Sequence, residues 1–426
     1  MHLYIDPGTG SMLFTILIGA ISSLVFFGRK LFLKLSFVLH GGKAAKGAGN
    51  EDRIPIAIFS DHKRYWNVFC PVCDELEKRG VRAEYMTASP DDPALEQTYE
   101  YVKTRFIGEG NAAFARLNML RADVILSTTP GLDVYQWKRS KYGGFYVHVL
   151  HAANDPIAYR MFGLDYYDAI LLSGSYQTAQ IRSLEEKRGL PAKELVLAGL
   201  PHMDLLASQL TAAGKDTHEG VNVLLAPSWG INGIFSVYGA SIVEALLATD
   251  CHIILRPHPQ SLQSEKEMID ALKAQFPDSD RLEWNTDNDN FEVLRRSDIL
   301  ISDFSGVIFD FTLVFDKPVI YADTSFDTGP LDAWWLGEDA LWTFRALPRI
   351  GHALVKEDLP RIGEVISHCL TDESFARARA EVRDETWVHR GESAALIAEY
   401  LIDKQHSLTA EDAGSMPDGT PSPQAG

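Results

Sequence analysis

Side chains suited to phosphate chemistry are concentrated in one short run, Ile254 to Pro259, which reads ILRPHP. An apolar segment ends there and is followed directly by the guanidinium of Arg256 and the imidazole of His258. Arginine can bind a phosphate through two parallel hydrogen bonds, and histidine can donate to a phosphate or transfer a proton. The prolines on both sides of His258 restrict the backbone, so the ring is expected to be held in place. A solvent-exposed turn is the alternative interpretation.

Two further segments in the same half of the chain could contact an anion. Ser302 to Gly306 (SDFSG) precedes an apolar helical run, and Ser305 is placed to cap that helix, whose free N–H groups would attract an anion. Ala226 to Gly233 (APSWGING) contains Ser228 and glycines that would let a ligand approach the backbone closely. Capped helices and connecting loops are common, and the glycine loop matches neither the Walker nor the dinucleotide-binding pattern. Neither segment is therefore specific alone.

The first half of the chain offers one candidate general base. Tyr146 to Pro156 reads YVHVLHAANDP, and two histidines three residues apart on a strand point to opposite faces. His151 lies at the expected end of the strand, where it could accept a proton from a hydroxyl. His148 is expected to pack in the core. Asp155 could orient His151 or cap the following helix.

Composition excludes several other classes of protein. The four cysteines in 426 residues rule out a disulfide scaffold and fit a reducing compartment. Cys70 and Cys73 have the spacing of a redox or metal motif, but no second pair lies near them, so structural packing is favoured; no metal and no cofactor are expected. The formal net charge of −18 argues against a general nucleic-acid binder, although a cleft can be locally positive.

The elements that must position these residues alternate between strands and helices. Most expected strands are continuous apolar runs, which is typical of a parallel sheet covered by helices on both faces. The expected strands are 54–59, 81–86, 123–127, 145–151, 168–173, 194–198, 221–227, 252–257, 298–303 and 318–322. Helical patterns include 175–188, 237–249, 262–276 and 306–315. Because ligands of such sheets bind outside the carboxyl ends of strands, the segments above are where a site is expected.

The sequence predicts an α/β fold of two successive doubly wound domains that face each other across a cleft. The most polar interruption, Thr211 to Gly220, places the boundary between a first domain at 54–215 and a second domain at 216–405. Residues 41–53 are glycine-rich and are expected to be a flexible tether. Residues 406–426 contain three prolines and no aromatic residue, which predicts a disordered tail. A helical pattern near 393–401 could return to the first domain.

Residues 1–40 are predicted to form a membrane anchor and a juxtamembrane segment. The span itself is about 11–28, eighteen uncharged residues, and no Lys or Arg precedes it. Basic residues follow it before the first acidic one: Arg29, Lys30, Lys34, Lys43 and Lys46. This asymmetry predicts a single-pass anchor with the soluble body on the cytoplasmic side. A signal peptide, which would carry its charges first, and a buried core helix are the alternatives.

Five short motifs in a fixed order resemble those of the CDP-glycerol glycerophosphotransferases, which are the teichoic-acid primases and polymerases. The motifs are the loop at His151, GLPHMD at 199–204, APSW at 226–229, RPHP at 256–259 and SDFS at 302–305. The similarity extends over about 145–325. It implies a GT-B fold, in which two Rossmann-like domains face each other, and membrane-associated transfer of glycerol phosphate from CDP-glycerol.

The resemblance also implies roles for individual residues. His151 matches the histidine that activates the acceptor hydroxyl, and Arg256 and His258 match the pair that contacts the donor pyrophosphate. Asp303 and Ser305, with Gly306, match the second donor-binding turn, and Ser228 lies in the remaining donor loop. The chain departs from the family where a basic residue is replaced by Gly230 and where a second serine is replaced by Gly306.

The leading hypothesis is a membrane-anchored transferase that releases CMP. An acceptor hydroxyl, deprotonated by His151, would attack the distal phosphorus of a CDP-linked donor, and Arg256, His258 and the helix start at Ser305 would stabilise the leaving group. The acceptor would be a lipid-linked or cell-surface glycan. One alternative is a GT-B glycosyltransferase that uses a nucleotide sugar and releases a diphosphate. The other is a non-catalytic relative in envelope assembly.

Overall fold

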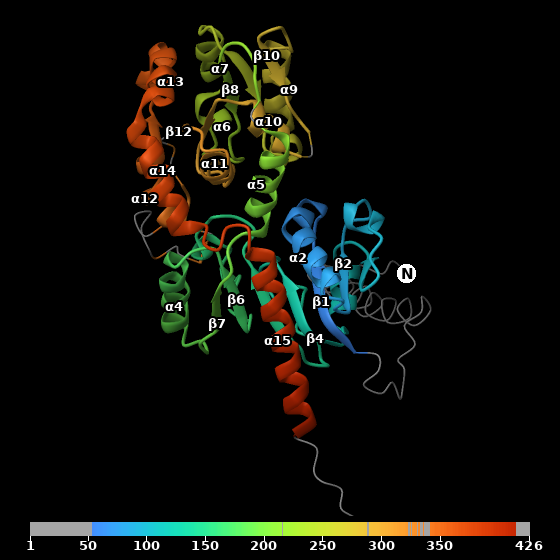
Figure 1. Cartoon of the computed structure of the whole chain (residues 1–426). Helices are drawn as coiled ribbons and strands as arrows, with labels where there is room; N and C mark the ends of the chain where they lie inside the picture. Colours follow the sequence, from blue (N-terminus) through green and yellow to red (C-terminus); the bar gives the residue numbers. More distant parts are fainter. Residues whose placement is uncertain are drawn as a thin grey trace, which may run out of the picture. The chain divides into compact units, whose positions relative to one another are not determined.

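The computed structural model describes residues 53–214, 216–287, 289–322, 324, 326–329, 331–332, 335 and 341–414. Within them the chain forms two parallel β-sheets, one from each half of the sequence (Figure 1). The predicted α/β fold with two Rossmann-like sheets is confirmed. The predicted membrane span at 11–28 lies outside the described residues. Among the helices of the described part, none combines the length and the apolar character that crossing a membrane requires.

The first sheet has seven strands in the order β3-β2-β1-β4-β5-β6-β7. The strands are β1 (Ile54–Ser60), β2 (Ala83–Thr87), β3 (Val102–Phe106), β4 (Ala122–Ser127), β5 (Phe145–Val149), β6 (Ala169–Leu172) and β7 (Glu194–Leu197). The helices between them are α2 (Trp66–Lys78), α3 (Asn111–Leu117) and α4 (Tyr176–Arg188), with short 3-10 turns η2 (Lys63–Tyr65), η3 (Pro93–Glu96) and η4 (Pro156–Ala158). The strand order reverses between β1 and β4, which opens a crevice at their carboxyl ends.

The second sheet repeats this order with six strands, β10-β9-β8-β11-β12-β13. The strands are β8 (Asn222–Leu225), β9 (His252–Leu255), β10 (Leu282–Trp284), β11 (Ile299–Ser302), β12 (Val319–Ala322) and β13 (Gly351–Leu354). The helical elements are α6 (Ile234–Tyr238), α7 (Ala240–Leu247), α8 (Ser261–Ser264), α9 (Lys266–Gln275), α10 (Phe291–Arg296), α11 (Val307–Phe309), the π-helix η5 (Asp310–Val314), α12 (Trp342–Ile350), η7 (Lys356–Arg361), α13 (Ile362–Thr371) and α14 (Glu373–Thr386). The reversal point here lies between β8 and β11.

Three strands that the sequence did not predict are β3, β10 and β13, and each lies at an edge of its sheet. An edge strand is exposed on one side, so it need not be a continuous apolar run. β3 illustrates this, because only Val102 of its five residues is buried. The ten predicted strands all exist, with ends that differ by a few residues.

Three predicted helices are interrupted. Gly239, at φ +55°, separates α6 from α7 within the expected 237–249 helix. Glu265 separates α8 from α9 within 262–276. The expected helix 306–315 is a short α-helical turn that continues as the π-helix beginning at Asp310. π-Helical turns are rare in proteins, and those that occur are often found at functional sites.

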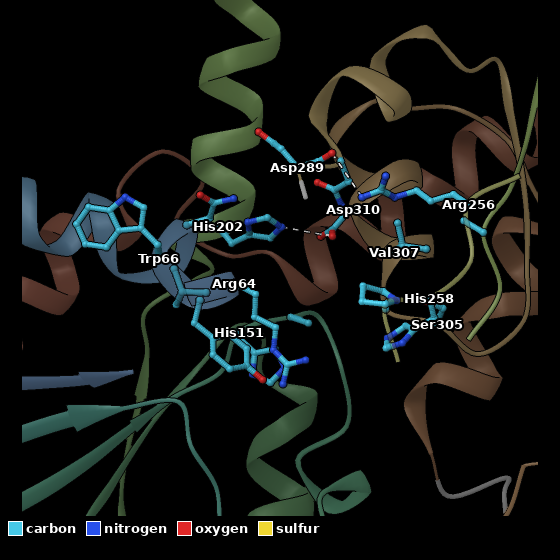
Figure 2. Close-up of a pocket in the computed structure, with 18 of the residues that line it drawn as sticks. Arg64, Trp66, His151, His202, Arg256, His258, Asp289, Ser305, Val307 and Asp310 are labelled. Carbon is cyan, nitrogen blue, oxygen red and sulfur yellow. Dashed lines mark hydrogen bonds and ion pairs between the residues drawn. The ribbon is translucent and has the colours of Figure 1, made fainter. Parts of the chain in front are cut away.

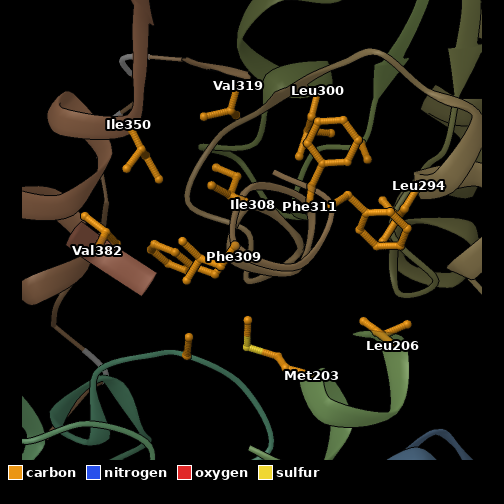
Figure 3. Close-up of a cluster of buried hydrophobic side chains, with 14 of the residues drawn as sticks. Met203, Leu206, Leu294, Leu300, Ile308, Phe309, Phe311, Val319, Ile350 and Val382 are labelled. Carbon is orange, nitrogen blue, oxygen red and sulfur yellow. The ribbon is translucent and has the colours of Figure 1, made fainter. Parts of the chain in front are cut away.

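Helix α5 (Pro201–Ala213) follows the first sheet but packs into the core of the second domain. Its Met203 and Leu206 are buried in a cluster with Ile308, Phe309 and Phe311 (Figure 3). Asp204 on the same helix accepts hydrogen bonds from the indole of Trp387 (2.8 Å) and from two backbone N–H groups of the segment after α14. Helix α5 therefore connects the two halves both in sequence and in space.

The last helix, α15 (Ser393–Gly414), returns to the first sheet, where it packs against α2 and β4 (Figure 1). Ile397, Ala398 and Leu401 are fully buried in the core of that sheet. Gln405 donates to Asp123 at 3.0 Å, and Lys404 pairs with Glu194 at 2.6 Å. The helix continues through 406–414, so the predicted disordered tail begins too early: apolar packing at 397–401 and these polar contacts hold the helix.

A Gly199→Ala variant is expected to be less stable than the wild type by about 2–4 kcal/mol. Gly199 has φ +82°, and an added Cβ would meet the hydroxyl of Ser393 and the carbonyl oxygen of Val388 inside van der Waals contact. The matched control is Gly189→Ala, because Gly189 also has a positive φ (+63°) but has nothing within 4 Å of an added Cβ. Chemical unfolding of both variants measures the difference; equal losses would show that the close approach at Gly199 contributes nothing.

Candidate functional site

A cavity of about 560 Å³ lies where the carboxyl ends of the two sheets meet (Figure 2). One wall comes from the first domain, namely the turn η2 after β1, the loop after β5 and the first turn of α5. The other wall comes from the segments after β8, β9, β10 and β11. The site is therefore built at the reversal points of both sheets and beside them, as expected for ligands of doubly wound sheets.

The structure brings five of the seven predicted site residues to this cavity. They are His151 from the first domain and Arg256, His258, Ser305 and Gly306 from the second. Ser228 and Asp303 are not among the residues that line it.

Asp303 is buried and accepts hydrogen bonds from the loop between β8 and α6. Its carboxylate accepts hydrogen bonds from the backbone N–H groups of Ser228 (3.0 Å) and Ile234 (3.2 Å). Burial raises the pKa of Asp303, against the lowering effect of these N–H donors. Asp303 therefore fixes the loop between β8 and α6, and the prediction that it contacts the donor receives no support from its position.

Ser305 does not cap the helix that follows, which corrects the sequence prediction. The helix α11 begins at Val307, its N-cap is Gly306, and no side chain caps it. The backbone carbonyl of Ser305 instead accepts from Ile308 at 3.1 Å. The Ser305 hydroxyl has no hydrogen-bond partner among the described residues and lines the cavity, so it can contact a ligand directly.

His151 is enclosed by polar and aromatic neighbours. Its Nδ1 lies 2.9 Å from the hydroxyl of Thr128, and its ring centroid lies 4.9 Å from that of Tyr65. Burial, with the positive charges of Arg64 and His202, lowers the pKa of His151 to about 4. His151 is therefore neutral at pH 7, and the tautomer that donates from Nδ1 to Thr128 leaves Nε2 free to accept a proton.

His258 is held by the turn that contains it. Its Nδ1 accepts from the backbone N–H of Gln260 at 3.1 Å, so the neutral ring carries its proton on Nε2. Burial and the charge of Arg64 lower the pKa of His258, while Glu265 opposes the shift. A neutral His258 is a hydrogen-bond donor at Nε2, as a ligand with phosphate oxygens requires.

Arg256 lines the cavity, but its guanidinium is already engaged. It donates to the side-chain oxygen of Asn285 and to the backbone carbonyls of Asp287 (2.8 Å) and Asp289 (3.4 Å). Burial lowers the pKa of Arg256, and the charges of Asp287 and Asp289 oppose this. The side chain thus holds the loop between β10 and α10 against the end of β9.

The cavity also contains residues that the sequence analysis did not single out. His202 and Asp310 face each other at 3.4 Å between α5 and the start of the π-helix (Figure 2). Burial lowers the pKa of His202, but the charge of Asp310 and the hydrogen bond to it outweigh burial, so the pKa is raised overall. His202 lies within the GLPHMD motif, so this motif could have indicated it as a site residue. Arg64 follows β1, and a strict inspection of strand ends would have found it.

Two predictions about the loop after β5 are decided by packing. His148 is fully buried and bonds the hydroxyl of Tyr159 at 3.2 Å, which confirms that it is a core residue. Asp155 does not orient His151. It caps a helix, although not the next one in sequence: it accepts from the backbone N–H groups of Trp342 (2.6 Å) and Thr343 (3.0 Å) at the start of α12.

The two cysteines at the start of the chain's described part share one helix. Cys73 is buried in the core of the first sheet, and Cys70 lies one turn earlier on α2. Burial raises the pKa of Cys70 to about 12, which disfavours the reactive thiolate. Within the residues that the structure describes, no group of His, Cys, Asp and Glu side chains is arranged to hold a metal ion.

Two Rossmann-like sheets with a cavity between their carboxyl ends define a protein of the GT-B type. Solved structures with the same fold include the wall teichoic acid polymerase TagF (13% identity, 90% of this chain and 99% of that chain, TM-score 0.55). A TagF variant soaked with CDPG is similar at 14% identity (85% and 91% covered, TM-score 0.55). MnaA from S. aureus in complex with UDP has 13% identity (83% and 97% covered, TM-score 0.57). At these identities the likeness concerns the fold alone.

The sequence itself points to a narrower class. Residues 163–328 match the model of the CDP-glycerol:poly(glycerophosphate) glycerophosphotransferase family. No curated protein sequence matches the chain. The matched segment contains four of the five motifs, and the match confirms the resemblance that they carry.

Proposed function

We propose that the enzyme transfers glycerol phosphate, or a related alditol phosphate, from a CDP-linked donor to a hydroxyl group of a lipid-linked or cell-surface glycan. The observation that carries this proposal is the family match at 163–328, because it includes the cavity wall formed by Arg256, His258 and Ser305. The first-domain wall, with His151, would then receive the acceptor.

The cavity residues suit an in-line displacement at phosphorus. The acceptor hydroxyl gives its proton to Nε2 of His151 as its oxygen attacks the distal phosphorus of the donor. The bond from that phosphorus to the bridging oxygen breaks, and CMP leaves with the electron pair. Hydrogen bonds from Nε2 of His258 and from the Ser305 hydroxyl would stabilise charge on the departing phosphate.

The bound donor would also adjust the basicity of His151. Burial and two cationic neighbours hold the pKa of His151 at about 4. A diphosphate brings negative charge next to the ring, which favours the protonated form. Donor binding would therefore make His151 a stronger base at the step where the proton must be accepted.

A His258→Ala variant is expected to release CMP from CDP-glycerol about 10²–10³-fold more slowly, as when one stabilising donor is removed from a developing anion. The assay uses the full chain with its membranes and separates CMP from CDP and UDP by chromatography. His368→Ala is the matched control, because His368 is exposed on α13 and far from the cavity residues in sequence. Undiminished CMP release would contradict the assignment, and release of a diphosphate would favour a glycosyltransferase.

We further propose that residues 11–28 anchor the enzyme in the membrane with its body in the cytoplasm. The support is the uncharged run itself and the five basic residues that follow it before Glu51. An anchor of this kind would hold the cavity close to lipid-linked acceptors.

A further inference from the structure

The two arginines that line the cavity differ in what they can offer a ligand. Arg256, from the second domain, donates to three acceptors of its own domain: the Asn285 side chain and two backbone carbonyls. A guanidinium has five N–H donors, and these three hydrogen bonds use most of the donors of Arg256. Binding a phosphate in bidentate fashion would require Arg256 to release the loop that it holds.

Arg64, from the first domain, is not committed in this way. It lies in η2, directly after β1, and it is exposed. Its guanidinium carbon lies 4.7 Å from the ring centroid of Tyr65, with which it also shares a side-chain hydrogen bond. Its charge acts on Asp61, but it forms no ion pair with any of the described residues. Its neighbour Lys63, by contrast, pairs with Asp91 at 2.5 Å.

Arg64 also reaches both walls of the cavity electrostatically. Its charge contributes to the lowered pKa of His151 on its own wall and of His258 on the opposite wall. Figure 2 shows Arg64 beside His151, facing the side that carries His258 and Ser305. An anion placed between the two histidines would therefore lie next to this guanidinium.

We propose that Arg64 binds the diphosphate of the donor from the first domain, opposite His258 and Ser305, while Arg256 acts by holding Asn285, Asp287 and Asp289 in position. This inference rests on the proposed nucleotide donor. The guanidinium of Arg64 can donate two parallel hydrogen bonds to phosphate oxygens, and stacking on Tyr65 orients it. The donor then bridges both domains, since its diphosphate contacts residues of each.

The test compares full-length Arg64→Gln and Arg64→Lys with Lys78→Gln, which removes one exposed positive charge from the neighbouring helix α2. Binding of CDP, CMP and inorganic pyrophosphate is measured by calorimetry. Arg64→Gln is expected to weaken CDP and pyrophosphate about 10–100-fold and CMP much less, as the loss of charge-assisted hydrogen bonds requires. Arg64→Lys should be intermediate, and Lys78→Gln should match the wild type.

Pyrophosphate separates this inference from the proposed function, because it carries a diphosphate without a nucleoside. If the wild type binds pyrophosphate through Arg64 yet releases no CMP from CDP-glycerol, the proposed reaction fails and the role of Arg64 stands. If Arg64→Gln binds pyrophosphate and CDP as tightly as the wild type, or if the wild type binds neither, the inference is overturned.

Two further measurements distinguish the arginines. Arg256→Gln is expected to lower the melting temperature without ligand, whereas Arg64→Gln should leave it unchanged because its side chain is exposed. Removing the charge of Arg64 raises the pKa of His151, so the acid limb of the kcat/KM profile should move to higher pH. A merely structural residue would not shift this limb, and an unshifted limb in Arg64→Gln would overturn its placement beside the reacting groups.

Discussion

A His151→Asn variant is expected to transfer the donor's phosphoryl group about 10²–10⁴-fold more slowly than the wild type, which is the usual contribution of a general base. Asparagine cannot accept a proton at neutral pH, although it can still bond the Thr128 hydroxyl that lies 2.9 Å from Nδ1 of His151. The loss should therefore be in kcat, with little change in donor binding. CMP release under saturating donor measures it.

The pH profile of the wild type provides an independent check. A base works only when it is unprotonated, so activity falls as the pH drops through its pKa. Because burial and the charges of Arg64 and His202 lower the pKa of His151 to about 4, the acid limb of kcat/KM should lie well below the ordinary histidine value of about 6.5.

Thr128→Val serves as the control for positioning. It keeps the shape of the side chain but removes the hydroxyl, so His151 stays present and loses its orienting contact; a loss smaller than that of His151→Asn is expected. If His151→Asn retained wild-type CMP release while folding normally, another group would have to be the base. The pair His202–Asp310 would then be the next to examine.

The second large effect concerns stability. Asp155→Ala is expected to lower the free energy of unfolding by about 2–4 kcal/mol, because buried donors would lose a charged acceptor. Asp155 is 1% exposed and accepts from Gln180 (2.5 Å), from two backbone N–H groups of α12 and from the Thr343 hydroxyl (2.6 Å). These partners belong to both domains, so the single unfolding transition should also broaden or split.

Chemical unfolding followed by fluorescence measures this change. Asp384→Ala is the control, since that carboxylate is 69% exposed and, among the described residues, pairs only with Arg390; its effect should stay within about 0.5 kcal/mol. Asp155→Asn keeps one acceptor oxygen and should fall between the two. Equal stability of Asp155→Ala and Asp384→Ala would show that the contact between Asp155 and α12 does not hold the domains together.

The fold was largely predictable because most strands are buried on both faces and therefore appear as continuous apolar runs. The exceptions, β3, β10 and β13, are edge strands, where one side is free of packing and the sequence pattern is weak. The return of α15 to the first sheet could be suspected from its periodicity, but its partner surface depends on tertiary contacts such as Gln405 with Asp123.

The placement of residues at the cavity could be predicted where position after a strand decides it. His151 and His258 follow strands, and parallel strands bring their carboxyl ends to one edge. It did less well where a side chain's partners lie far along the chain. Nothing near Asp303 in sequence shows that it accepts from Ser228 and Ile234, and nothing near Arg256 shows that Asn285 engages it. Arg64 was missed although it follows β1, because an exposed arginine in a charged run is distinguished only by its place after a strand.

The return of α15 to the first domain has a consequence for biosynthesis. The core of the first sheet includes Ile397, Ala398 and Leu401, which the ribosome adds only after the whole second domain has been made. Until then, the apolar surface of α2 that these residues cover is exposed to solvent, and such surfaces promote aggregation and chaperone binding. The first domain is thus completed last. If translation stops before these residues are added, the core of the first sheet remains incomplete.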